Sequence, residues 1–448
     1  MTNTNAIVYR LCAQTVLLLV WYAGAALLAA VKFLSVDPLA NALPYSQVNG
    51  FANVVLHLTL VTGLIAGGLY MVRLQSVTDQ PQDERGMLWL WRAWTLFLVL
   101  SVLAGVLGLL EGRANAELPF VLDVAEIILL GIWLVMIVRP LNSATLLNAP
   151  EHPGQGTTRA AWNGFLLVWA AGLALCIAGL LIGLLPANDL LTERVLSVLS
   201  QGLRDTLGLR SMGLAVAFWI LTRVSNSATG WIEASLLRVA GVSLIAGALM
   251  SASQVLHLPN AIQASGIGAA LFSLFASAWL IAYSYRALSN RAPIHTLAVH
   301  WYTLGLILLT VGNGVLGAVL ALPSVQAVAQ GTQLTVLQHH LSAVGLLAWV
   351  LGFINQAVAE MRGQNFRVTG LVPFWCVALG VGGASLAFFA AGVVQVYLER
   401  LMSVGYLETQ TALVPLYALW IGGLLLFAPG VAFYALGFRA RPVEGASS

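Results

Sequence analysis

The sequence predicts an all-α, polytopic membrane protein with about twelve transmembrane helices. Of the 448 residues, 59% are hydrophobic and only 8% are charged, whereas roughly a quarter of the residues of a soluble domain are charged. Apolar runs of about 20 residues, the length that crosses a bilayer core of about 30 Å, recur along the whole chain. The connections between these runs are too short for a folded soluble domain. We therefore expect a single transmembrane domain over 1–448.

Each expected span is an apolar run bounded by polar residues, glycine or proline. In chain order the spans are 9–33, 51–74, 88–110, 118–138, 161–185, 200–223, 232–256, 262–287, 296–322, 333–359, 370–397 and 412–438. The sixth is the least apolar, because Arg204, Asp205 and Arg210 lie in its first half. Either these residues form a buried ion cluster, or the sixth helix starts later than drawn.

The distribution of basic residues predicts the orientation of the chain. With a cytoplasmic N-terminus, 14 of the 20 basic residues fall on the inner side, as the positive-inside rule requires. Those left on the outer side are Lys32, Arg113, Arg194, Arg204, Arg210 and Arg400. Both termini are therefore expected in the cytoplasm. The net charge of +3 is too small to indicate nucleic-acid binding.

Three of the seven histidines lie inside apolar helices, where an imidazole is costly unless it has a partner. These are His57, His339 and His340. The other four, in loops or near helix ends, are most simply solvated or interfacial residues. Because adjacent helical residues point about 100° apart, His339 and His340 cannot both face one cofactor. His57 and His340 are expected in the outer third of the membrane at similar depth, which suits a haem held between two helices. The alternative is that each imidazole makes a hydrogen bond to a neighbouring helix.

Two acidic residues, Asp123 and Glu126, are expected inside the fourth span. They are three residues apart and so share one face of a helix. They either conduct protons along a water-filled path or form a structural hydrogen-bonded pair. The three cysteines, Cys12, Cys176 and Cys376, lie in apolar runs without a CxxC pair, which indicates packing residues rather than a disulfide or zinc site.

Four segments carry a resemblance to a known family. They are "GLIAGGLYMV" (63–72), "EGRANAELPFVLDV" (111–124), "LPNAIQASG" (258–266) and "GNGVLGAVLALPSVQAVAQGTQLTVLQHHLSAVG" (312–345). In this order they resemble segments of subunit I of the haem–copper oxidase superfamily. The branch that they resemble holds the large subunit of nitric oxide reductase and the catalytic subunit of the cbb-type oxidases. The resemblance implies a twelve-helix bundle of that kind.

Residue by residue, the resemblance predicts that most metal ligands are missing. The family's His-x-His triplet on helix ten reads Gln338–His339–His340, so that only His340 matches a ligand, the one to the low-spin haem. The copper-ligand pair at the end of helix seven aligns with Ser251 and Ala252, and helix six has no histidine.

A second haem ligand is less clearly placed on helix two. A gapless comparison puts Phe51 at the family's ligand position on that helix, with Asn53 at a frequent asparagine. His57 lies about 9 Å further along the axis.

The resemblance implies a respiratory membrane protein without a binuclear centre. It would hold at most one low-spin haem b, through His340 with His57, and no copper, and would act as an electron-transfer or accessory subunit. Its expected partners are the lipid bilayer of a bacterial inner membrane and other respiratory subunits or a cytochrome c-like protein. Two alternatives stay open. One is an active oxidase or nitric oxide reductase with rearranged ligands, and the other is a haem-free protein that reuses the scaffold to handle small molecules or metals.

Overall fold

The computed structural model describes residues 3–34, 44–75, 84–110, 118–139, 159–187, 189–225, 227–255, 259–290, 296–362 and 370–439. Every element within these ranges is a helix. In chain order they are α1 (Asn3–Leu34), α2 (Tyr45–Gln75), α3 (Glu84–Val106), α4 (Phe120–Val138), α5 (Arg159–Gly183), α6 (Leu190–Gln201), η3 (Gly202–Leu209), α7 (Arg210–Val224), α8 (Thr229–Val255), α9 (Pro259–Ser289), α10 (Thr296–Leu309), η4 (Thr310–Leu316), α11 (Gly317–Ala321), α12 (Pro323–Ala329), α13 (Gln333–Arg362), α14 (Leu371–Val396), η5 (Tyr397–Leu401) and α15 (Tyr406–Arg439). The segments η3, η4 and η5 are π-helical turns.

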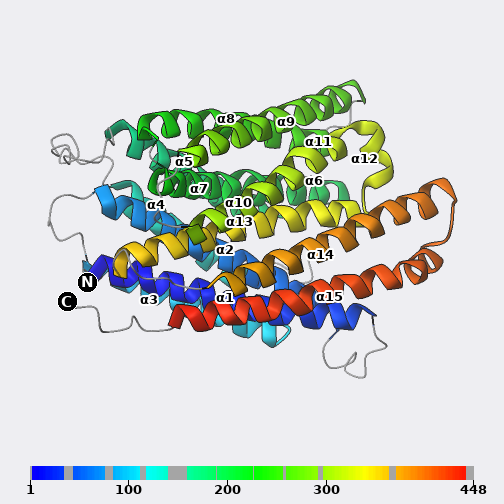
Figure 1. Cartoon of the computed structure of the whole chain (residues 1–448). Coiled ribbons are helices and arrows are strands. Elements are labelled where there is room, and N and C mark those ends of the chain that lie inside the picture. Colours follow the sequence, from blue (N-terminus) through cyan, green and yellow to red (C-terminus); the bar gives the residue numbers. More distant parts are fainter. Residues whose placement is uncertain are drawn as a thin grey trace.

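Twelve helices in the described ranges are long and apolar enough to cross a membrane, which confirms the predicted fold class. α6, η3 and α7 together form the sixth span, and α10, η4 and α11 form the ninth. Figure 1 shows the helices running roughly along one direction. The start of α1 and the end of α15 lie at the same end of the bundle (Figure 1), as an even number of spans requires.

The helix boundaries differ from the predicted ones by six residues or more at the starts of four spans. The sixth span begins at Leu190, ten residues before the predicted start, and Asp189 caps it by accepting a hydrogen bond from the backbone N–H of Thr192 (2.7 Å). The expectation that this helix might start later is therefore wrong. The first, second and twelfth spans begin at Asn3, Tyr45 and Tyr406 instead of 9, 51 and 412. In each case the helix continues beyond its apolar core.

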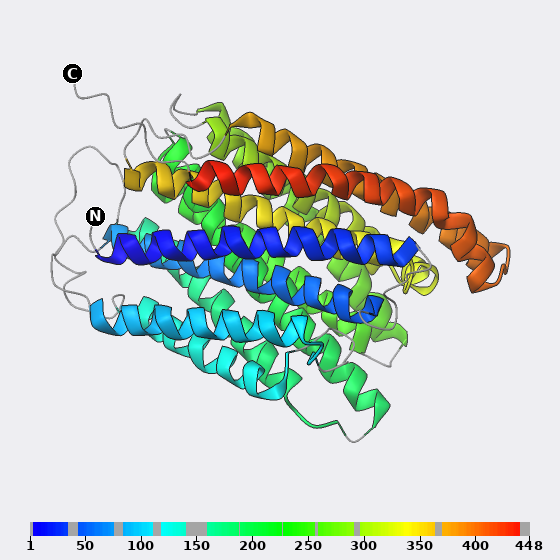
Figure 2. The same cartoon turned by 90° about the horizontal axis from the view of Figure 1, so that it is seen from below.

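The centre of the bundle is formed by α2, α13 and the α6–α7 span. Their most apolar windows are 89%, 89% and 83% buried by protein, against 28% for α4 and α15. α4 and α15 therefore present most of their surface to lipid. On the side seen in Figure 2, α1 and α15 lie side by side, and the rings of Tyr9 and Phe438 stack between them with centroids 5.2 Å apart.

Close backbone contact joins α14 to α15. A Cβ atom on Gly380 would lie 2.6 Å from the carbonyl oxygen of Gly423 and 2.7 Å from the backbone nitrogen of Phe427. Small residues at such contacts let two membrane helices approach closely. Neither of these neighbouring atoms belongs to a side chain that could rotate away.

We therefore expect Gly380→Val to separate α14 from α15 and to lower the midpoint of thermal unfolding of the detergent-purified protein. The matched control is Gly382→Val, two residues along the same helix, where an added Cβ would meet nothing within 4 Å. Equal unfolding midpoints for the two variants would contradict this account of the contact.

A polar cluster joins three helices at the end of the bundle that holds the start of α1. Glu360 of α13 accepts hydrogen bonds from Arg223 of α7 to both carboxylate oxygens (2.9 Å each). It also accepts from the hydroxyl of Tyr70 on α2 (2.9 Å) and from the side-chain amide of Gln356 (2.8 Å). We call Glu360, Arg223, Tyr70 and Gln356 the Glu360 clamp. It ties together the three central helices.

Candidate functional site

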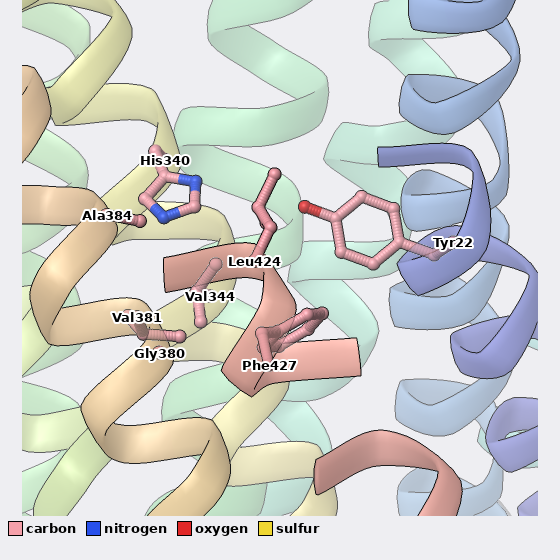
Figure 3. A pocket seen from close by; sticks show the side chains of 8 residues that line it. All are labelled: Tyr22, His340, Val344, Gly380, Val381, Ala384, Leu424 and Phe427. Carbon is pink, nitrogen blue, oxygen red and sulfur yellow. The ribbon is translucent and has the colours of Figure 1, made fainter. Parts of the chain in front are cut away.

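His340 lies on α13 and faces a small pocket among α1, α14 and α15. Its Nε2 atom is buried and has no hydrogen-bond partner among the described residues. Its ring contacts that of Phe388, with centroids 5.8 Å apart. Figure 3 shows His340 and Tyr22 on opposite sides of this pocket, with Leu424 and Phe427 of α15 between them. One imidazole nitrogen is therefore free to bind a ligand there.

The pocket is small and largely apolar. Its volume is about 10 Å³, which is close to the space that a single water molecule needs. Besides His340 and Tyr22, the lining residues are Val344, Gly380, Val381, Ala384, Leu424 and Phe427. A haem would enter only if side chains such as Leu424 and Phe427 moved. Among the residues that line the pocket, His340 is the only one with an imidazole, so the pocket offers one such ligand and not two.

His57 makes a different contact from the one that a shared haem requires. Its Nε2 atom lies 2.9 Å from Oε1 of Glu126, which is almost fully buried on α4. The acidic residue singled out from the sequence is thus half of an interhelical histidine–glutamate pair. Asp123, one turn earlier on α4, is also buried. The partner of Glu126 is thus His57 and not, as one alternative had it, Asp123, and the choice between proton conduction and a structural role stays open.

The two helices that carry the candidate ligands are neighbours, as expected. A Cβ on Gly63 of α2 would lie 2.3 Å from a methyl group of Val350 on α13. His57 precedes this contact by six residues, and His340 precedes it by ten. As the second and tenth spans run in the same direction, the two imidazoles differ in depth by roughly 6 Å, about one helical turn. Binding of one haem by both histidines stays a prediction.

The positions that the resemblance assigns to the missing ligands are filled by packing side chains. The amide nitrogen of Gln338 lies 4.0 Å from the sulfur of Met250 on α8. The hydroxyl of Ser251 occupies the space that a Cβ on Gly202 of η3 would take. Within the described residues, no group of three or more His, Cys, Asp or Glu side chains is arranged to hold a metal ion.

His339 points away from the pocket of His340, as the helical spacing predicts. Its imidazole interacts electrostatically with Asp205 of η3, which interacts in the same way with His57. Asp205 itself forms an ion pair with Arg204 (2.9 Å). Of the predicted buried cluster of Arg204, Asp205 and Arg210, only the Arg204–Asp205 pair is found among the described residues, and its Asp205 side chain is 45% exposed. This pair lies between the surroundings of His57 and those of His339.

Of the four remaining histidines, one lies within the described residues. His300 on α10 packs its ring against Phe374 (5.3 Å), while His152, His257 and His295 lie outside the described residues. Sequence reasoning missed the Glu360 clamp, because the sequence shows Arg223 only as an inner-side charge. The signal that could have found it is an acidic and a basic residue each near the inner end of an apolar helix.

Comparison with known proteins gives a partial match to a respiratory membrane protein. The chain is 30% identical over 144 residues to a subunit of nitric oxide reductase from Stutzerimonas stutzeri. The match covers 29% of this chain and 30% of that protein. No protein-family profile matches the chain. The similarity supports a partial relationship to the membrane proteins of the oxidase superfamily.

Proposed function

We propose that this chain is a respiratory-type membrane protein without a binuclear centre, which acts as an electron-transfer or accessory subunit. Its partial similarity to the nitric oxide reductase of Stutzerimonas stutzeri supports the respiratory class. Its place is then a bacterial inner membrane. Its partners there are other respiratory subunits or a cytochrome c-like protein.

The contacts of Gln338 and Ser251 carry this proposal. An amide and a hydroxyl stand where the resemblance expects imidazoles, and both are committed to packing, one against Met250 and the other against Gly202. Transition-metal sites in proteins are built from imidazole, thiolate or carboxylate ligands. A side chain that fills space between helices cannot serve as such a ligand unless the helices separate.

At most one haem b belongs to this proposal, bound through His340. The observation that supports it is the buried Nε2 atom of His340, which faces the pocket and has no partner. A bound haem would supply one-electron transfer. What the chain itself contributes is a single imidazole in apolar surroundings.

The test is a metal and activity analysis of the detergent-purified protein. We expect substoichiometric copper and non-haem iron, no high-spin haem signal, and no reduction of oxygen or nitric oxide above the background of a Gln338→Ala variant. Stoichiometric copper or non-haem iron together with turnover would overturn the proposal in favour of an active reductase with rearranged ligands.

A further inference from the structure

Two arginines and two aromatic side chains form a cluster that joins α8 to α9. The guanidinium of Arg286 lies over the ring of Trp231, 4.7 Å from its centroid, and this ring meets that of Tyr283 edge to face, with centroids 5.5 Å apart. Nη1 of Arg238 donates a hydrogen bond to the hydroxyl of Tyr283 (3.3 Å). We call Arg238, Tyr283, Trp231 and Arg286 the arginine–aromatic cluster.

The cluster lies on a part of the bundle that other helices leave largely uncovered. Figure 1 shows α8 and α9 side by side along one edge of the bundle. Their most apolar windows are only 39% and 44% buried by protein. Arg238 and Arg286 are both exposed. Since the outer surface of these two spans faces the bilayer, the molecules that meet the two guanidinium groups there are lipids.

The depth of the cluster places it near the headgroups at one end of the bundle. Arg286 lies three residues before the end of α9, and Arg238 lies nine residues after the start of α8. Nine residues correspond to about 13 Å of helix. Long basic side chains at such a depth keep their apolar stem in the bilayer and extend the charge toward the headgroups. Both guanidinium groups can therefore reach the phosphates of one leaflet.

No acidic side chain balances the two charges. Neither arginine forms an ion pair within the ranges that the structure describes, and α9 contains no acidic residue. Glu233 of α8 lies about 140° away from Arg238 around the helix and accepts a hydrogen bond from the backbone N–H of Gly164 on α5 (2.8 Å). Because the two aromatic partners are neutral, the cluster carries two positive charges, and most of the N–H donors of its guanidinium groups stay unused.

The surface next to the cluster is apolar in the direction of the bilayer centre. Trp279 lies two turns before Arg286 on the same face of α9, and Ile245 lies two turns after Arg238 on the same face of α8. These two side chains are 40% and 46% exposed. Two cationic groups beside an exposed apolar surface match an amphiphile with an anionic head and a hydrocarbon tail. A soluble anion would contact only the cationic groups.

We propose that the arginine–aromatic cluster binds the phosphodiester headgroup of an anionic glycerophospholipid, with an acyl chain along Trp279 and Ile245. The inference is independent of haem binding and of the proposed respiratory role. Basic clusters between helices at the membrane surface bind anionic headgroups, and a planar guanidinium suits a phosphate because two of its N–H groups can bind two oxygens at once. A lipid bound here would stabilise the contact between α8 and α9.

Thermal unfolding of the delipidated protein in detergent tests the site. Phosphatidylglycerol, phosphatidylcholine with the same acyl chains, and glycerol 3-phosphate are titrated separately. Because a ligand that binds only the folded state raises its stability by mass action, we expect phosphatidylglycerol to raise the unfolding midpoint to a plateau, at a lower concentration than phosphatidylcholine. Glycerol 3-phosphate, which has no acyl chain, should have no effect at the same concentrations. Arg238→Gln and Arg286→Gln should each weaken phosphatidylglycerol binding roughly fivefold, and the double variant about 25-fold.

Arg92→Gln is the matched control. Arg92 lies eight residues after the start of α3, is exposed, and lies over the ring of Trp89, 5.2 Å from its centroid. This variant should keep the full effect of phosphatidylglycerol. The proposal is overturned if phosphatidylglycerol acts no better than phosphatidylcholine, if glycerol 3-phosphate gives the same rise, or if Arg92→Gln loses as much as Arg238→Gln.

Should the double variant fail to fold, native mass spectrometry decides. The wild type and Arg238→Gln are each presented with an equimolar mixture of phosphatidylglycerol and phosphatidylcholine. A wild type that retains phosphatidylglycerol in preference, with a preference about fivefold weaker in Arg238→Gln, supports the site. Equal retention of the two lipids by the wild type, or an unchanged preference in the variant, refutes it and leaves this face to a protein partner.

Discussion

Glu360→Ala is expected to destabilise the bundle by about 3 kcal/mol, because it leaves Arg223 as an uncompensated charge between helices. The carboxylate accepts two hydrogen bonds from Arg223 and one from Tyr70. The Arg223 and Glu360 side chains are only 19% and 18% exposed, so water replaces these contacts poorly. The measurement is the free energy of unfolding in detergent micelles titrated with a denaturing detergent.

A double variant shows whether the loss comes from the unpaired charge. Arg223→Met combined with Glu360→Leu replaces the ion pair by apolar side chains of similar length, and we expect it to recover most of the lost stability. A loss in Glu360→Ala below about 0.5 kcal/mol, the size of an ordinary surface substitution, would show that the clamp contributes nothing to stability.

The fold could be predicted because the bilayer fixes the length of each apolar run. Hydropathy carries no information about a helix that continues beyond its apolar core, and this is why the starts of four spans were misplaced. The start of the sixth span depends on the cap at Asp189, and a single capping aspartate in a polar loop gives a weak signal. Its interior was harder to predict because Arg204 and Asp205 lower the hydropathy there while satisfying each other.

The sequence predicts how deep the residues of the candidate site lie in the membrane, but not the direction in which their side chains point. Position along a helix follows from counting residues, so the placement of His57 and His340 within about one helical turn of the same depth was foreseeable. Which way a side chain points is read from amphipathicity, and central membrane helices are apolar on all sides. The pairing of His57 with Glu126, 69 residues away, therefore left no trace in the pattern. The same holds for Arg223 and Glu360, which are 137 residues apart.

In protein that carries a b-type haem, His340→Ala is expected to abolish the low-spin signal in the reduced-minus-oxidised optical spectrum. The reason is that a six-coordinate haem loses that state when an axial imidazole is removed, and His340 alone presents a free imidazole nitrogen to the pocket. His339→Ala should leave the spectrum intact, because this side chain points about 100° away and interacts with Asp205.

The His57→Ala variant tests whether His57 binds haem together with His340, as the sequence predicts, or stays bound to Glu126, as in the structure. With Nε2 of His57 held by Glu126 at 2.9 Å, the variant should keep the low-spin signal, and the second axial ligand must then come from another residue. Loss of the signal in His57→Ala would mean that haem binding breaks the His57–Glu126 contact and turns this side chain toward α13. A wild-type protein that stays free of haem when expressed with ample haem supply would end the ligand interpretation for all three histidines. His340 would then be a buried imidazole packed against Phe388.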